Sequence, residues 1–188
     1  IGRKHVKILS KIKKGLNFLI LTNQKLRKYK TINKIEHSLE YNPDYIVISN
    51  FTSKHYLTIK KIEKLFKNKT ILVEKPLFDK ARSYKVKNNK YYIGYNLRLH
   101  PVIKKIKELI QGKVINYVEF NTDTFLPSWR KNLPYHISSS ASKKKGGGVI
   151  LDLSHELDIL LFLFQKVNVL ASINKKVSNL NINTDDLL

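Results

Sequence analysis

Short apolar segments alternate with amphipathic helical patterns over the first half of the chain, and this alternation constrains the fold most. Apolar runs typical of buried strands cover residues 16–21, 44–48, 70–73 and 91–95. Between the second and third runs, residues 53–67 place apolar side chains at helical spacing. Strand–helix–strand units of this length pair their strands in parallel. The pattern predicts an α/β fold with a doubly wound parallel sheet.

The sequence pattern changes near residue 97, and we place a domain boundary there. The segments that follow predict a helix over residues 101–111 and an alternating strand over residues 114–120. A long polar loop over residues 125–145 comes next, followed by an apolar helix over residues 149–164 and a strand over residues 167–173. A loop as long as the third segment is uncommon in a compact domain unless it has a function. We expect a parallel-sheet domain over residues 1–97, and the start of an α+β substrate-binding and oligomerisation domain with a more open sheet over residues 98–188.

The chain has no cysteine and no methionine. The absence of cysteine excludes a disulfide framework, cysteine–zinc sites, iron–sulfur clusters and thiol catalysis, and we predict no metal site. It also favours a cytoplasmic location over an oxidising compartment. Every apolar run is too short to span a bilayer, so we predict no membrane partner.

The chain carries 36 Lys and Arg against 14 Asp and Glu, a formal net charge of +22. This charge raises the alternative of a nucleic-acid-binding protein, because neutralised phosphates release counterions. Most of the cations are lysines spread along the chain, whereas readout of bases favours arginine. Lys, Asn, Ile and Tyr are abundant together, as AT-rich codons would specify. We attribute the charge mainly to this bias and predict no specific nucleic-acid partner.

Gly2 stands at the start of an amphipathic helical pattern over residues 3–14. In dinucleotide-binding folds, the third glycine of G-x-G-x-x-G occupies such a position, where helix amides hold the pyrophosphate. Residues 1–6 fit the end of that fingerprint. Because the chain also does not begin with Met, we expect it to be a fragment without the first strand and its two glycines.

Thr22 and Asn23 follow the next predicted strand, where an Asp or Glu would indicate NAD by binding the adenosine ribose. Arg27 and Lys28 come shortly after, so a 2′-phosphate could be tolerated. A solvated loop is the alternative interpretation.

Glu74, Lys75 and Pro76 come directly after the strand predicted over residues 70–73. Ligands of open α/β sheets bind outside the carboxyl ends of the strands. A lysine held there by the fixed backbone of proline could direct its ammonium group at a substrate hydroxyl. An ordinary surface turn is the alternative, since lysine is common throughout the chain.

Three glycines at residues 146–148 precede the apolar helix that is predicted to contain Asp152, His155 and Asp158. Such glycines allow close approach of a ligand. Asp152 and His155 are three residues apart and would share one helical face. A carboxylate beside an imidazole is typical of a general base. A structural pair is the alternative, and Asp158 offers the same spacing on the other side of His155.

These segments, in this order, resemble the Gfo/Idh/MocA family, which contains glucose–fructose oxidoreductase and inositol dehydrogenase. The matching segments are Gly2-x-x-His5, residues 49–55, Glu74-Lys75-Pro76, residues 94–101, residues 114–120, the glycine-rich helix over residues 146–158, and residues 183–186. The resemblance covers essentially the whole chain. It implies a Rossmann domain followed by an α+β domain with a large, mostly antiparallel open sheet that commonly forms a homo-oligomer interface.

The resemblance also implies a reaction, in which a hydride passes between nicotinamide and a carbinol carbon of a sugar, nucleotide sugar or cyclitol. The cofactor would be NAD or NADP. Lys75 would hold or deprotonate the substrate hydroxyl, His155 would be the general acid/base, and Asp152 would support them. The implied cofactor-binding residues are Gly2, His5, Thr22, Asn23, Asn50, Thr52, His55, Glu74 and Lys75. The implied substrate-binding residues are Lys75, Asn96, Arg98, Trp129, Arg130 and His155.

Residues 126–130 resemble a bacterial subgroup associated with surface-sugar biosynthesis. The family more often places its Asp and His four residues apart, so either Asp152 or Asp158 could partner His155. The 188 residues by themselves could be inactive although the full gene product would be an enzyme. A non-catalytic cofactor-binding or regulatory protein of the same fold is the main alternative function.

Overall fold

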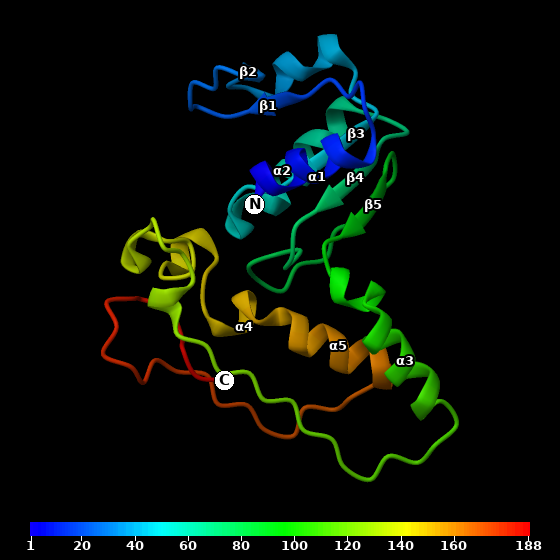
Figure 1. The fold of residues 1–188 in the computed structure, drawn as a ribbon, viewed down its shortest axis with the longest axis vertical. Coiled ribbons are helices and arrows are strands. Elements are labelled where there is room, and N and C mark those ends of the chain that lie inside the picture. Colours follow the sequence, from blue (N-terminus) through cyan, green and yellow to red (C-terminus); the bar gives the residue numbers. More distant parts are fainter. The chain divides into compact units, whose positions relative to one another are not determined.

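The computed structural model describes all residues 1–188, which separate into two compact units (Figure 1). The N-terminal unit comprises Ile1–Asn50 and Lys54–Ile93, and the C-terminal unit comprises Phe51–Ser53 and Gly94–Leu188. None of the helices is both long enough and apolar enough to cross a membrane.

The N-terminal unit contains five short strands, all paired in parallel. They are β1 (Leu19–Leu21), β2 (Lys30–Ile32), β3 (Tyr45–Ile48), β4 (Thr70–Val73) and β5 (Lys90–Ile93). β1 pairs with β2, and β3, β4 and β5 form a second sheet in that order. The predicted α/β class with parallel strands is confirmed. The strands form two small sheets rather than the single doubly wound sheet that the sequence predicted.

Helix α2 (Thr52–Leu65) covers the three-stranded sheet and completes the core of this unit. The buried apolar side chains come from β3, α2, the residue after α2, and β4: Ile48, Ile59, Ile62, Phe66, Ile71 and Val73. Burial of one such side chain stabilises the fold by about 1.5–3 kcal/mol. Helix α1 (Gly2–Ile12), which lies close to its predicted bounds, and a 3₁₀ helix over Ile35–Tyr41 complete the unit.

Glu63 ties the turn before β5 to helix α2. Its carboxylate accepts hydrogen bonds from the backbone N–H of Lys87 at 3.0 Å, from that of Asn88 at 3.1 Å and from Asn89 Nδ2 at 2.7 Å. Burial raises the pKa of Glu63, but these hydrogen bonds together lower it below the ordinary value of a glutamate.

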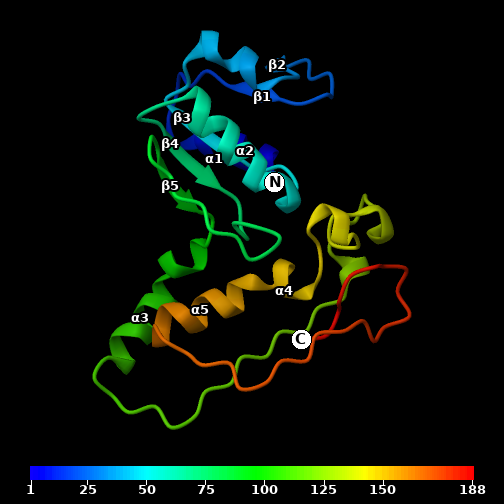
Figure 2. The ribbon, with the colours of Figure 1, turned by 180° about the vertical axis from the view of Figure 1, so that it is seen from behind.

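The C-terminal unit is built from helices and irregular chain. Its helices are α3 (Pro101–Ile110), α4 (Val149–Asp152) and α5 (Ser154–Phe164), and short 3₁₀ turns cover Asn96–Leu99, Leu126–Ser128, Tyr135–Ile137 and Lys143–Lys145. Figure 2 shows α3 beside α5, and the ammonium group of Lys107 lies 3.7 Å from the centre of the Phe162 ring. The long loop predicted over residues 125–145 contains three of these four 3₁₀ turns and no α-helix or strand.

Two predictions for this unit are wrong. Residues 114–120 and 167–173 are not strands, and the unit has one isolated antiparallel bridge, between Lys175 and Leu187, in place of the expected open sheet. Alternating apolar residues stabilise a strand only when a neighbouring strand supplies the backbone hydrogen bonds. Neither segment has such a neighbour, and Val114 and Leu170 remain 87% and 97% exposed.

The predicted helix over residues 149–164 is also wrong in one respect, because it is interrupted. Leu153, with φ −99° and ψ 25°, separates α4 from α5. Its backbone N–H still bonds to Val149 O at 2.8 Å, so the chain turns there without losing that hydrogen bond.

Candidate functional site

In the N-terminal unit, two turns with the predicted chemistry lie side by side at one edge of a sheet. Ile48 and Val73 are paired at the carboxyl ends of β3 and β4, so the turns that begin at Ser49 and Glu74 leave the sheet together. The backbone N–H of Glu74 donates to Ile48 O at 2.9 Å. This is the edge at which open α/β sheets bind their ligands.

The start of helix α1 approaches the same edge. A Cβ atom on Gly2 would lie 3.0 Å from Ser49 Oγ, so glycine allows the helix to pack closely there. One turn further along, His5 Nε2 is hydrogen-bonded to Glu74 Oε1, and both side chains are largely buried. Gly2, His5 and Glu74 were all predicted to line the cofactor, and the structure brings them together.

His55 lies inside the unit, with only 1% of its surface exposed. Its Nδ1 is 3.1 Å from Pro76 O and 3.2 Å from Leu77 O, and its Nε2 is 3.3 Å from Asn50 O. Carbonyl oxygens from both turns therefore face this one ring. His55 was predicted to line the cofactor, and the structure assigns it contacts that join the two turns.

Three further residues predicted to bind the cofactor, Asn50, Thr52 and Lys75, also lie in or beside these two turns. Asn50 Nδ2 donates to Thr58 Oγ1 at 2.9 Å, and Thr52 is the first residue of α2. Lys75 is half-buried and is joined to Pro76 by a cis peptide bond.

A second feature of the N-terminal unit is an open hollow at the carboxyl ends of β1 and β2. Its volume is about 580 Å³. Thr22 and Asn23, the predicted ribose-binding residues, line it together with Gln24, Lys25, Thr31, Ile32, Asn33 and His37. Arg27 and Lys28, which the sequence suggested for a 2′-phosphate, are not among the lining residues. The cationic residue that lines the hollow is Lys25.

In the C-terminal unit, Asp152 and His155 lie in two different helices, α4 and α5. The argument that placed them on one face of a continuous helix is therefore wrong. Asp152 Oδ2 accepts from the backbone N–H of Gly148 at 3.4 Å. The His155 ring meets the Tyr95 ring edge-on, with centroids 5.7 Å apart.

Asp158 is paired with Arg98. The carboxylate accepts from Arg98 Nε at 2.8 Å and also from Nη2, and Asp158 is only 6% exposed. The hydrogen bond to Asp158 raises the pKa of Arg98. The structure thus gives Asp158 a partner other than His155. It also holds Arg98, a predicted substrate-binding residue that follows Asn96 in the same 3₁₀ turn, against α5.

The glycines before α4 accommodate the chain itself. A Cβ atom on Gly147 would lie 2.2 Å from Ser139 O, and one on Gly148 would lie 2.5 Å from Asp185 Oδ1. Asp185 also caps α4, because its backbone oxygen accepts from Val149 N at 3.1 Å and its carboxylate accepts from Ile150 N at 3.3 Å. We predicted that these glycines let a ligand come close. In the structure, they instead let the chain at Ser139 and Asp185 come close.

Trp129 and Arg130 lie in the long loop, where a hollow of about 540 Å³ is lined by Pro127, Ser128, Arg130, Lys131, Asn132, Leu133, Pro134 and Tyr135. Trp129 Nε1 donates to Thr124 Oγ1 at 2.5 Å. Both residues were predicted to face the substrate, and Arg130 borders this hollow.

Sequence reasoning missed two residues that shape these sites, Lys25 and Asp185. Lys25 lines the hollow beyond β1 and β2, and Asp185 caps α4 from a distant part of the chain. Only Asp185 had a signal, as part of the acidic turn over residues 183–186. Groups of three or more acidic or imidazole side chains with the geometry of a metal site do not occur in the structure. The chain matches no protein-family model and no curated protein.

Proposed function

We propose that this chain is part of an NAD(P)-dependent oxidoreductase of the Gfo/Idh/MocA family. The enzyme transfers a hydride between nicotinamide and a carbinol carbon of a sugar, nucleotide sugar or cyclitol. One observation carries the proposal: the start of α1, the turn after β3 and the Glu74-Lys75-Pro76 turn after β4 converge at the carboxyl edge of a parallel sheet. This edge is where doubly wound folds bind dinucleotides.

The residues at the start of α1 fit a dinucleotide pyrophosphate. No side chain caps the helix, and its first turn contains no acidic residue. The first backbone N–H groups of an α-helix have no partner within the helix, and the helix dipole favours an anion beside them. Gly2 lets the start of α1 pack closely against Ser49 of the turn after β3. These features support pyrophosphate binding by α1.

The strand pairing also supports a doubly wound fold. In the strand order 3-2-1-4-5-6, strands 3 and 2 lie on one side of strand 1 and strands 4, 5 and 6 lie on the other. The pairs β2–β1 and β3–β4–β5 correspond to these two groups. We propose that a strand from upstream of Ile1 pairs with both β1 and β3 and leads through a glycine-rich turn into α1.

The proposed chemistry assigns a role to three side chains. Bound nicotinamide supplies the hydride donor or acceptor. Lys75 Nζ holds the substrate hydroxyl or takes its proton, because the turn after β4 carries Lys75 at the ligand-binding edge of the sheet. The His155 ring acts as general acid/base, and Asp152 orients it. Asn96, Arg98, Trp129 and Arg130 bind the substrate. The enzyme works in the cytoplasm, in bacterial surface-sugar biosynthesis, as a homo-oligomer.

The test is turnover by the protein expressed from its complete coding sequence. Absorbance at 340 nm is followed with NAD, NADP and a panel of aldoses, nucleotide sugars and inositols. Lys75→Ala and His155→Ala should each reduce kcat by about 10²-fold or more, the usual contribution of a positioned acid or base. Lys80→Ala and His136→Ala, at exposed positions outside the proposed site, are the matched controls and should leave kcat unchanged.

Three results would contradict this assignment in different ways. Unchanged kcat in Lys75→Ala and His155→Ala would remove their catalytic roles. Cofactor binding without turnover on the whole panel would indicate the non-catalytic alternative. No dinucleotide binding, with DNA affinity that persists at physiological salt, would favour the nucleic-acid-binding alternative.

A further inference from the structure

We infer that His5 and His55 are positioning residues, which hold the turn after β4 at the residues before and after Lys75 and so keep its ammonium group where the reaction needs it. This inference rests on the proposed function and adds two residues to it. Neither imidazole ring has a step in the proposed reaction, and both contact residues that adjoin Lys75 in the chain.

The residue before Lys75 is held by its backbone and by its side chain. The backbone N–H of Glu74 donates to Ile48 O at 2.9 Å, which extends the contact between β3 and β4 beyond the last paired residues. An ionised carboxylate only accepts hydrogen bonds, so His5 Nε2 is the donor in its contact with Glu74 Oε1. Glu74 therefore ties the turn to α1.

The two residues after Lys75 contact α2. His55 Nδ1 lies 3.1 Å from Pro76 O and 3.2 Å from Leu77 O, and the ring is 1% exposed. The third contact of the ring, from Nε2 to Asn50 O, is the longest at 3.3 Å. Carbonyl oxygens only accept, and a neutral imidazole has one N–H group. The two shorter contacts favour Nδ1 as the place of that group, so that the ring holds the backbone directly after Lys75.

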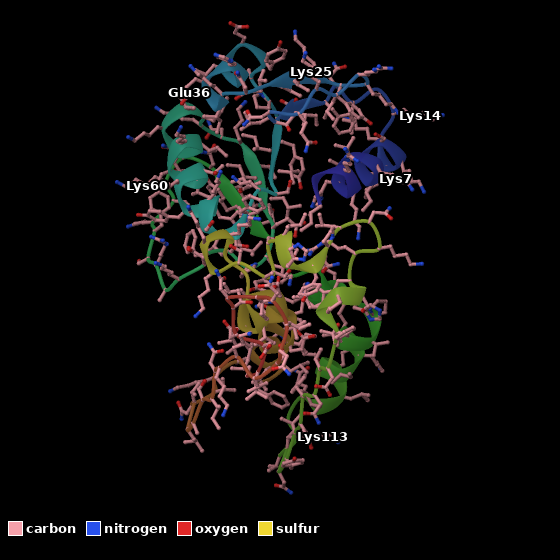
Figure 3. The ribbon with its side chains drawn as sticks, turned by 90° about the vertical axis from the view of Figure 1, so that its left-hand side faces the viewer. Lys7, Lys14, Lys25, Glu36, Lys60 and Lys113 are labelled. Atoms are coloured by element: carbon pink, nitrogen blue, oxygen red, sulfur yellow. The ribbon has the colours of Figure 1, made fainter.

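The two histidines belong to different helices. His5 is in the first half of α1, and His55 is in the first turn of α2. Figure 3 marks these helices by Lys7 and Lys60, which lie on opposite sides of the N-terminal unit. A segment that is held at one point can still rotate about that point, whereas contacts before and after a residue fix the direction of its backbone. The side chain between them then starts from a defined place.

The position of Lys75 matters because its proposed role depends on the distance and direction to the substrate hydroxyl. A misplacement of about 1 Å, caused by a change away from the chemistry, can lower a rate by about 10²-fold. Reactive side chains are held at this precision by neighbours that are themselves fixed by packing and hydrogen bonds. His55 meets both conditions, because it is buried and faces carbonyl oxygens of two turns.

The experiment uses the protein expressed from its complete coding sequence and two conservative variants of His55. The amide nitrogen of asparagine corresponds to Nδ1 of histidine and that of glutamine to Nε2, because each is the same number of bonds from Cβ. His55→Asn can therefore still donate to Pro76 O and Leu77 O. His55→Gln can donate only toward Asn50 O. With saturating cofactor, we expect His55→Asn to keep kcat within about threefold and His55→Gln to lower it by about 10- to 100-fold.

His5→Ala tests the other contact and gives a result even if a His55 variant does not fold. It removes the donor to Glu74 and should lower kcat by about 10-fold. Glu63→Gln is the matched control. Glu63 is buried on α2 like His55, and its carboxylate holds the turn before β5, at the other edge of the sheet. This variant should be less stable and should keep its kcat.

A double-mutant cycle separates positioning from a general structural role. Residues that act only through Lys75 have no effect on the reaction once Lys75 is absent. His55→Gln and His5→Ala should therefore lower kcat/KM no further in a protein that already carries Lys75→Ala. Equal losses with and without Lys75 would mean that the rings support the fold alone, and would overturn the inference.

The remaining outcomes separate the inference from the proposed function. Unchanged kcat in both His55→Gln and His5→Ala would overturn the inference and leave the proposed function standing. A loss of kcat in His55→Asn, with retention in His55→Gln, would assign the ring to the turn after β3 and overturn the role of His55. No turnover of the whole substrate panel by the unaltered protein would overturn the proposed function and the inference together.

Discussion

In the N-terminal unit, apolar strands pair with one another under a helix, whereas in the C-terminal unit the strand-like segments stay unpaired and polar contacts hold the chain. The core of the N-terminal unit consists of six buried apolar residues. The C-terminal unit buries few apolar side chains, and most of its buried side chains are polar: Ser138, Ser140, Ser154, Asp158 and Thr184, with Ala141 and Ile159 as the apolar exceptions.

The difference shows what an apolar pattern needs in order to become a strand. β4 has a hydrogen-bonded neighbour on each side, which its backbone requires once it is buried. Residues 114–120 alternate between apolar and polar side chains but have no neighbouring strand, so their side chains remain exposed. In that unit, the segment over residues 183–186 performs the stabilising role instead. It caps α4 through Asp185, and Thr184 Oγ1 donates to Ser140 O at 3.0 Å.

The largest expected effect comes from a cavity in the apolar core. Ile71 is fully buried in the central strand β4, and Ile71→Ala should lower the free energy of unfolding by about 4 kcal/mol. Hydrogen exchange followed by mass spectrometry should show the loss of protection in β3, β4 and β5. If the two units are stabilised separately, α4 and α5 keep their protection. Ile106→Ala, at a more exposed position on α3, is the control and should cost much less.

The second prediction breaks the polar packing of the C-terminal unit. Gly147→Ala would force a Cβ atom against the backbone oxygens of Ser139 and Ser140, and overpacking of this kind costs about 3 kcal/mol. The single tryptophan, Trp129, lies in this unit, so its fluorescence in denaturant reports the loss.

The control for Gly147→Ala is Gly112→Ala. Gly112 has φ +71°, but a Cβ atom at this position would meet no other atom within 4 Å, so its substitution should cost only about 1–2 kcal/mol. A Gly147→Ala variant no less stable than Gly112→Ala would mean that the chain over residues 139–140 can move aside, and that the packing is looser than the structure indicates.

The smallest prediction concerns pH and the N-terminal unit. Glu63→Gln replaces an acceptor of three hydrogen bonds by a group that cannot accept them all, and should cost about 2 kcal/mol at neutral pH. The pKa of Glu63 is lowered in the folded state. Its stabilising contribution is therefore fully present above the unfolded pKa of about 4.3 and is lost as the pH falls through the lower folded pKa.

Denaturant unfolding at neutral and acidic pH measures this contribution. The difference between the original protein and Glu63→Gln should shrink as the pH falls below about 4.3. Glu108→Gln, at an exposed position of α3, is the control. A difference that stays constant with pH would assign the effect to packing and not to ionisation.

The elements that could be predicted share a physical origin. α2 and β4 lie within two residues of their expected bounds, because their apolar spacing matches the face that they bury. The break at Leu153 could not be predicted, because the apolar run continues through it. Among the candidate site residues, the sequence brought Gly2, His5 and Glu74 into one hypothesis, and their contacts depend on strand register, which spacing alone does not give.

The sequence by itself determined the α/β class, the parallel pairing over the first half and the residue types available for chemistry, because these depend on local spacing and composition. The tertiary structure decided which groups meet. It joined His5 to Glu74, gave Asp158 to Arg98, and placed Lys25 in the hollow beyond β1. It also decided which alternating segments became strands. A hydrogen bond or ion pair needs two groups within about 3 Å, and the chain path that brings distant residues so close is set by the packing of the whole unit.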